Sequence, residues 1–82
     1  MSAVRDVVET VARALADSPQ RVAVTEAERQ GTTFIEITVA PPDAGKLIGR
    51  QGRTIAAMRT LATATGERLG KKVTLDVRDG LG

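Results

Sequence analysis

The sequence contains no cysteine and no histidine among its 82 residues. Without cysteine it can form neither a disulfide framework nor a thiolate metal site. Without histidine it lacks the commonest metal ligand and the usual general base near neutral pH, so we predict no metal or cofactor. Phe34 is the only aromatic residue, which leaves aliphatic side chains to form a small core. We expect one domain over residues 1–82, with its core at about residues 3–79.

Long apolar runs are missing as well. No stretch of about 20 apolar residues is present, so the sequence predicts no membrane-spanning helix. The first ten residues include Arg5, Asp6 and Glu9 and lack the apolar segment of a signal peptide. We therefore expect a cytoplasmic protein that has no membrane partner and no small-molecule substrate.

Charge is unevenly distributed along the chain, although the formal net charge is only +2. Residues 1–43 carry four basic and seven acidic side chains, a net of −3. Residues 44–72 carry seven basic and one acidic side chain, a net of +6, and residues 73–82 have a net of −1. Such a basic block favours an anionic partner on one face, although a solvated helix face would account for the charges equally well.

An apolar stripe predicts a helix at the start of the chain. Its members recur at the spacing of 3.6 residues per turn and are Val4, Val7, Val8, Val11 and Leu15. Asp17, Ser18 and Pro19 should end this helix, because proline cannot continue the hydrogen-bond ladder and disfavours a helical residue before it.

Two alternating segments predict an antiparallel hairpin. Residues 21–28 alternate weakly and residues 32–39 clearly, and Gln30-Gly31 between them is a turn signal. The side chains expected to face the core are Val22, Val24, Thr33, Ile35, Ile37 and Val39. Phe34 should lie on the opposite face of the sheet. A third strand is expected at Lys72 to Val77, from the same alternation.

Two helices are expected between the second and third strands. Asp43 is placed to cap a short helix that begins at Ala44. A longer helix of roughly 12 to 15 residues should follow Gly52 and end near Gly66 or Gly70. Its apolar stripe consists of Ile55, Met58, Ala62, Thr65 and Leu69. Arg59 should lie on the outer, solvated side of this helix.

The predicted order is therefore α-β-β-α-α-β. A strand, two helices and another strand form a crossover, which makes the second and third strands parallel neighbours. Only one face of each strand is apolar, so all three helices should cover the same face. The fold class is α+β: a three-stranded mixed sheet covered on one face by three helices.

Two glycines bracket two polar residues between the second and third helices. Gly49 lets the chain leave the short helix with positive φ, and Gly52 lets the backbone approach a bound group closely. The long helix begins directly afterwards, so its free N–H groups and positive dipole end point into the same space as Arg50 and Arg53. This combination is typical of a phosphodiester-binding site. Taken alone, two such glycines can equally make a tight helix–helix turn.

Residues 48–55 read Ile-Gly-Arg-Gln-Gly-Arg-Thr-Ile and resemble the Ile-Gly-x-x-Gly-x-x-Ile signature of KH domains. The chain as a whole is similar to the small bacterial single-KH proteins called KhpA, and the resemblance covers roughly residues 1–79. Because the additional helix and strand precede the βααβ unit, the resemblance implies the type II KH fold.

The resemblance also assigns roles to residues. In KH domains the GxxG loop clamps about four nucleotides by their backbone, and the bases lie in an adjacent apolar groove. The residues that would form this clamp are Gly49, Arg50, Gln51 and Gly52. Ile48 and Ile55 match the isoleucines that support the loop and floor the groove. Lys46 and Arg53 would contact flanking phosphates, and Val39 would line the groove wall.

The resemblance implies a non-catalytic protein that binds single-stranded RNA, acting as an RNA chaperone or post-transcriptional regulator. KhpA-type proteins also resemble partners of a second bacterial RNA-binding protein, KhpB or Jag, and are linked to cell-envelope and division control. The alternative is thus a protein-interaction module that uses the KH surface to dock this larger partner or to dimerise. The sequence leaves open whether it forms a homodimer or a heterodimer.

An enzymatic function is not predicted. Residues 40–46 lack the first glycine of a Walker motif, and Lys46 is followed by Leu47 where that motif needs serine or threonine. The glycines of residues 45–52 do not space as GxGxxG. No pair of carboxylates lies beside the loop, so general acid–base chemistry has no obvious agents.

Overall fold

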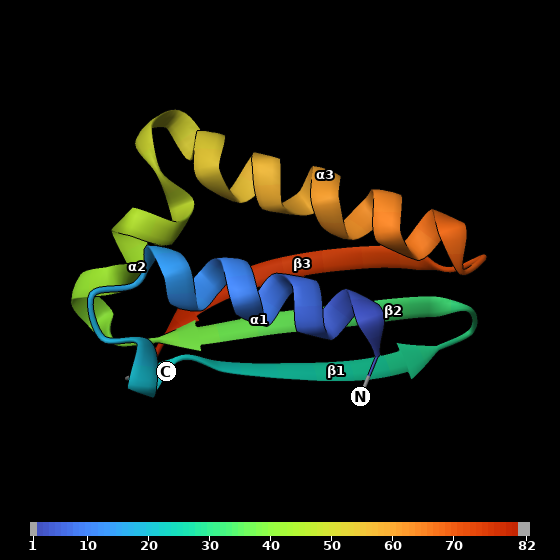
Figure 1. Ribbon diagram of the computed structural model, residues 1–82, viewed down its shortest axis with the longest axis horizontal. Helices are drawn as coiled ribbons and strands as arrows, with labels where there is room; N and C mark the ends of the chain where they lie inside the picture. The colour runs from blue at the N-terminus through green and yellow to red at the C-terminus, as the bar shows by residue number, and fades with distance from the viewer. Residues whose placement is uncertain (1, 81–82) are drawn as a thin grey trace.

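A computed structural model describes residues 2–80 (Figure 1). In chain order the elements are α1 (Ala3–Leu15), a 3₁₀ turn (Pro19–Arg21), β1 (Ala23–Arg29), β2 (Thr32–Val39), α2 (Pro41–Ile48), a 3₁₀ turn (Arg50–Gly52), α3 (Arg53–Arg68) and β3 (Lys72–Asp79). The predicted order α-β-β-α-α-β is confirmed. No helix within residues 2–80 is long and apolar enough to cross a membrane.

The three strands form one mixed sheet with β2 in the middle. β1 pairs antiparallel with β2, and β3 pairs parallel with β2, as the crossover through two helices requires. All three helices cover the same face of this sheet, and the other face is open (Figure 1). Phe34 lies on the open face, where it pairs with Ala27 and Thr74 on the neighbouring strands and keeps 44% of its surface exposed. The predictions that the three helices cover one face and that Phe34 lies on the other face are confirmed.

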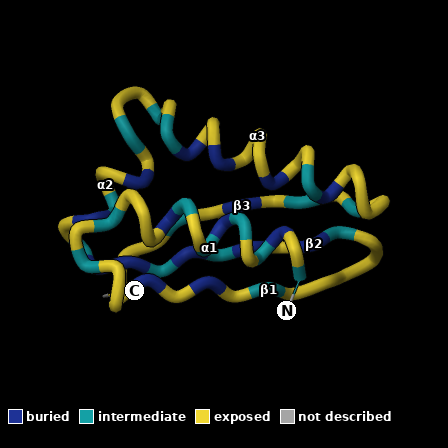
Figure 2. Tube along the Cα trace, in the orientation of Figure 1, coloured by how far each residue is buried: buried dark blue, intermediate teal, exposed yellow. Residues whose placement is uncertain are grey.

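The core lies between the helices and the sheet, and the buried positions recur along each element with the period of its secondary structure (Figure 2). Its members are Val4, Val8, Ala12, Val22, Val24, Ile35, Ile37, Val39, Leu47, Ile55, Met58, Ala62 and Leu75. All inward strand positions predicted from the alternation are buried, including Thr33, whose hydroxyl donates to Glu28 Oε1 at 3.4 Å. The first helix differs from its predicted stripe at one end, because Ala12 is buried whereas Leu15 is exposed.

The role predicted for Asp43 is wrong. α2 begins earlier than expected, at Pro41, because proline is well suited to the first turn of a helix. Asp43 therefore lies inside that turn, and its side chain is almost fully buried. Its two carboxylate oxygens accept hydrogen bonds from the backbone N–H groups of Asp17 and Ser18, at 3.1 and 3.0 Å. The carboxylate thus fixes the loop that follows α1 to the start of α2.

α3 ends where the sequence analysis expected, between Gly66 and Gly70. The helix continues through Gly66 to Arg68, so it has 16 residues, and Leu69 beyond it is exposed. Gly66 is buried where α3 crosses β3: a methyl group at this position would lie 2.5 Å from Val73 Cγ2 and 3.0 Å from Lys71 O. The absence of a side chain at Gly66 therefore allows close helix–sheet packing instead of ending the helix.

Candidate nucleic-acid interface

The loop between α2 and α3 has backbone angles that favour glycine at both ends. Gly49 ends α2 with φ of +78°, and its N–H donates to Gly45 O at 2.8 Å. Gly52 precedes α3 with φ of +71°, and its N–H donates to Gly49 O at 3.0 Å. Gln51 between them also has positive φ, +56°. The chain therefore reverses within four residues and starts α3 beside the end of α2.

The two glycines differ in what surrounds them. A methyl group on Gly49 would lie 2.7 Å from Thr54 Cβ and 2.9 Å from Thr54 N, so this position is closed by the first turn of α3. A methyl group on Gly52 would have no neighbour within 4 Å. Gly49 is therefore needed for packing, whereas the space beside Gly52 is open to a ligand. The loop offers an exposed backbone surface at this point.

Positive charge gathers around this loop, from two arginines and the N-terminus of α3. Within residues 2–80 no side chain caps the N-terminus of α3, and the N–H group of Arg53, its first residue, donates to Arg50 O in the loop. The positive end of the α3 dipole lies at this point. Arg50 is exposed and has no ion-pair partner among residues 2–80. Arg53 Nη2 donates to Gln51 Oε1 at 3.1 Å, which orients both side chains above the loop. This arrangement is chemically suited to bind a phosphate group.

Lys46 lies on the last turn of α2, one turn before Gly49, and is not free in this structure. Its amine forms an ion pair with the carboxylate of Asp17 in the loop after α1. The hydrogen bond to that carboxylate is the main reason that the pKa of Lys46 lies above its ordinary value. Both side chains are largely exposed, so the pair is weak and can be exchanged for another anion.

The two signature isoleucines lie in different surroundings. Ile55 is buried in the core below the first turn of α3. Ile48 is the last residue of α2, and 41% of its surface remains exposed next to the loop. Ile55 thus anchors α3, while Ile48 presents an apolar surface to whatever binds there.

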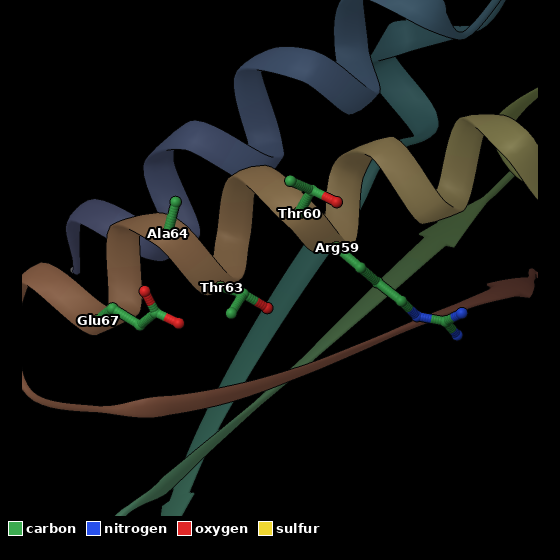
Figure 3. A pocket seen from close by; sticks show the side chains of 5 residues that line it. All are labelled: Arg59, Thr60, Thr63, Ala64 and Glu67. Carbon is green, nitrogen blue, oxygen red and sulfur yellow. The ribbon is translucent and has the colours of Figure 1, made fainter.

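A groove runs between α3 and the outer edge of β3. It has a volume of about 280 Å³, and the residues that line it are Arg59, Ala62, Thr63, Val73, Thr74, Leu75 and Asp76. A second hollow of about 350 Å³ continues along the outer surface of α3 and shares Arg59 and Thr63 with the groove (Figure 3). Val39 does not line this groove. It is buried in the middle strand, so the wall predicted there is provided by β3 instead.

Arg59 is exposed, as the sequence analysis expected, but the contact that it makes with β3 was not predicted. Its side chain crosses from α3 to β3 (Figure 3), where Nε donates to Leu75 O at 3.0 Å and Nη2 lies 3.5 Å from Asp76 Oδ1. A sequence signal was available, because Arg59 follows Ile55 by four positions and precedes Ala62 by three. That spacing places it on the border of the buried stripe.

A strand–helix–helix–strand unit with a GxxG loop between its helices, preceded by one more helix and strand, defines a type II KH domain. The particular family follows from the sequence: residues 5–77 match the family described as KhpA/KhpB, KH domain. The chain belongs to this family.

Curated relatives agree with this assignment. The chain is 47% identical to the RNA-binding protein KhpA of Aquifex aeolicus over 94% of this chain and 98% of the relative. It is 39% identical to the RNA-binding protein KhpA of Chlamydia caviae over 92% of this chain and 96% of the relative.

Two crystal structures of Era contain the same fold. One is Aquifex aeolicus Era bound to GDP·AlF4−, with a TM-score of 0.64, and one is Era in complex with MgGDPNP and nucleotides 1506–1542 of 16S ribosomal RNA, with a TM-score of 0.65. Both are 22% identical, and the match covers 93% of this chain but only 29% of Era. The likeness to Era therefore concerns the fold alone.

Proposed function

We propose that this protein is a non-catalytic single-stranded RNA-binding protein that clamps the RNA backbone with the loop from Gly49 to Gly52. The observation that carries the proposal is the geometry of this loop. The loop combines open space beside Gly52, the N-terminus of α3, and an exposed Arg50 that has no ion-pair partner among residues 2–80. The names of the relatives in this family support an RNA ligand.

The bases of the same RNA would lie in the groove between α3 and β3. Its volume, about 280 Å³, is sufficient for a nucleobase, and aliphatic side chains of Ala62, Val73 and Leu75 form part of its lining. KH domains hold bases in a groove of this kind without aromatic stacking, which agrees with a single aromatic residue, Phe34, that lies on the opposite face of the sheet. Such a protein would act as an RNA chaperone or post-transcriptional regulator.

Fluorescence anisotropy with a labelled RNA octamer at several salt concentrations tests the proposal. We expect micromolar-range affinity or weaker, because a single KH domain contacts only about four nucleotides. Two to four neutralised phosphates would give a slope of log affinity against log salt of about −1.4 to −2.8. A blunt RNA duplex of equal length is the control and should bind less tightly. Absence of binding, or binding without salt dependence, would contradict the clamp.

A role in self-association is the second candidate function, and one feature of the surface favours it. Apolar side chains surround a hollow of about 290 Å³: Ala3 of α1, Leu61 and Ala64 of α3, and Leu69 directly after α3. Leu61 and Leu69 are about half exposed. A second copy of the chain would fit this apolar patch, since one patch can pair with itself across a two-fold axis. Two linked RNA clamps would also bind one RNA more tightly than a single clamp.

Sedimentation equilibrium tests the self-association. We expect wild type to form a dimer and Leu61→Asp to be monomeric, because a dimer would bury the new carboxylate against apolar side chains. Circular dichroism of the variant should be unchanged, since Leu61 lies outside the core. A monomeric wild type at high micromolar concentration would refute this second function without affecting the RNA clamp.

A further inference from the structure

Arg59 is held at the groove between α3 and β3 by contacts to the strand. The hydrogen bond from Nε to Leu75 O, 3.0 Å long, fixes one edge of the guanidinium, and Asp76 lies 3.5 Å from Nη2. The Asp76 carboxylate is 80% exposed, so this ion pair adds little, and the backbone hydrogen bond sets the orientation. Arg59 therefore presents a planar group in a defined position at the groove.

The hydrogen bond from Arg59 to Leu75 O also changes which hydrogen-bond donors and acceptors the edge of β3 presents to a ligand. Lys72 N–H donates to Gly31 O and Gly80 N–H to Val39 O, so the even-numbered backbone groups of β3 face the neighbouring strand β2. By alternation, the N–H and C=O groups of Leu75 face the open edge and the groove. The carbonyl oxygen of Leu75 already accepts the hydrogen bond from Arg59 Nε. The groove therefore has one acceptor fewer and offers the donors of a guanidinium instead.

The donors that remain are suited to a particular class of base. Arginine has five N–H donors, and those on Nη1 and the outer side of Nη2 have no hydrogen-bond partner among residues 2–80. Such a fork pairs with two adjacent acceptors. Cytosine has them at O2 and N3 and guanine at O6 and N7. Adenine places its amino group beside N1 and N7, and uracil has a donor between its two carbonyls.

We propose that Arg59 is the base-specificity residue of this protein and selects, in the groove between α3 and β3, bases that present two adjacent acceptors. The inference rests on the proposed RNA-binding function and adds to it the class of RNA that is preferred. It assigns Arg59 a role in choosing between bases, whereas the GxxG loop binds the backbone of any sequence.

Anisotropy titrations with octamers of cytidine, adenosine and uridine test this selection. Wild type should bind the cytidine octamer on the order of tenfold more tightly than the other two, as one bidentate arginine–base pair provides. Arg59→Lys keeps the charge but removes the planar fork, so the three affinities should converge while the salt dependence stays the same. Arg68→Lys, the same change at an exposed position of α3, is the matched control and should keep the preference.

A change in the ligand provides a test that does not depend on how a variant folds. Octamers with 3-deazacytidine carry a C–H group in place of the N3 acceptor, and wild type should bind them as weakly as uridine octamers. Equal affinity of wild type for all three natural octamers, or a preference that survives in Arg59→Lys, would overturn the inference and leave the clamp intact. Failure of wild type to bind any octamer would instead refute the proposed RNA-binding function itself.

Discussion

The double variant R50D/Q51D is expected to bind single-stranded RNA at least on the order of 100-fold less tightly than wild type. One cation at the open side of the loop is removed, and two carboxylates are placed where a phosphate would lie. A single charge-assisted hydrogen bond contributes about 1.5–3 kcal/mol, and like-charge repulsion weakens binding further. The salt dependence of any residual binding should also be weaker, by about 0.7 in slope for each phosphate that the loop no longer neutralises.

The same variant should keep its fold, which makes the result interpretable. Both side chains are exposed and contribute nothing to the core. Gln51 has φ of +56°, a conformation that aspartate adopts more readily than most residues. Two carboxylates at the N-terminus of α3 also interact favourably with the helix dipole. Circular dichroism and a thermal melt should therefore match wild type.

The chain provides a close control, because the tripeptide Arg-Gln-Gly occurs twice. It forms the loop at 50–52 and the β1–β2 turn at 29–31, at opposite ends of the molecule (Figure 1). The variant R29D/Q30D changes the net charge by the same amount, and Gln30 also has positive φ, +51°. We expect its RNA affinity to stay within about threefold of wild type, because surface charges far from the site act only through a screened field. Equally weakened binding in both variants would mean that net charge, and not the loop, controls binding.

The second large effect is expected from Asp43→Ala, which should destabilise the protein by roughly 2–3 kcal/mol. The substitution removes the acceptor of two backbone N–H groups, those of Asp17 and Ser18, and leaves them without a partner. A chain of 82 residues is ordinarily stable by roughly 4 to 12 kcal/mol, so this decrease is a large part of the total. Urea unfolding followed by circular dichroism measures it as a lower midpoint at an unchanged slope.

Two related variants separate the buried carboxylate from its surroundings. Asp17→Ala removes only an exposed side chain and its surface ion pair with Lys46, so the free energy of unfolding should change by less than about 0.5 kcal/mol. Asp43→Asn keeps one acceptor oxygen and should give an intermediate destabilisation. If Asp43→Ala were as stable as wild type, water would have replaced the carboxylate and the loop would not depend on it.

Local patterns determined most of the fold. Alternation at residues 32–39 assigned each side chain to the correct face, and the strand–helix–helix–strand order required a parallel pair of β2 and β3. The prediction for Asp43 was wrong because aspartate has a common local use as a helix cap. Asp43 instead binds the loop after α1, and Gly66 packs closely against β3. Local propensity contains no information on either contact.

The two Arg-Gln-Gly segments separate what sequence determines from what tertiary structure decides. Gln30-Gly31 and Gln51-Gly52 all have positive φ, so the same two residues share this unusual feature of the backbone in both places. Local sterics suffice for that, since glycine tolerates positive φ and a two-residue reversal requires it. Only the fold places α3 and the groove with Arg59 beside the second segment. The first segment joins two strands and lies far from both, because the chain on either side of it pairs into a sheet.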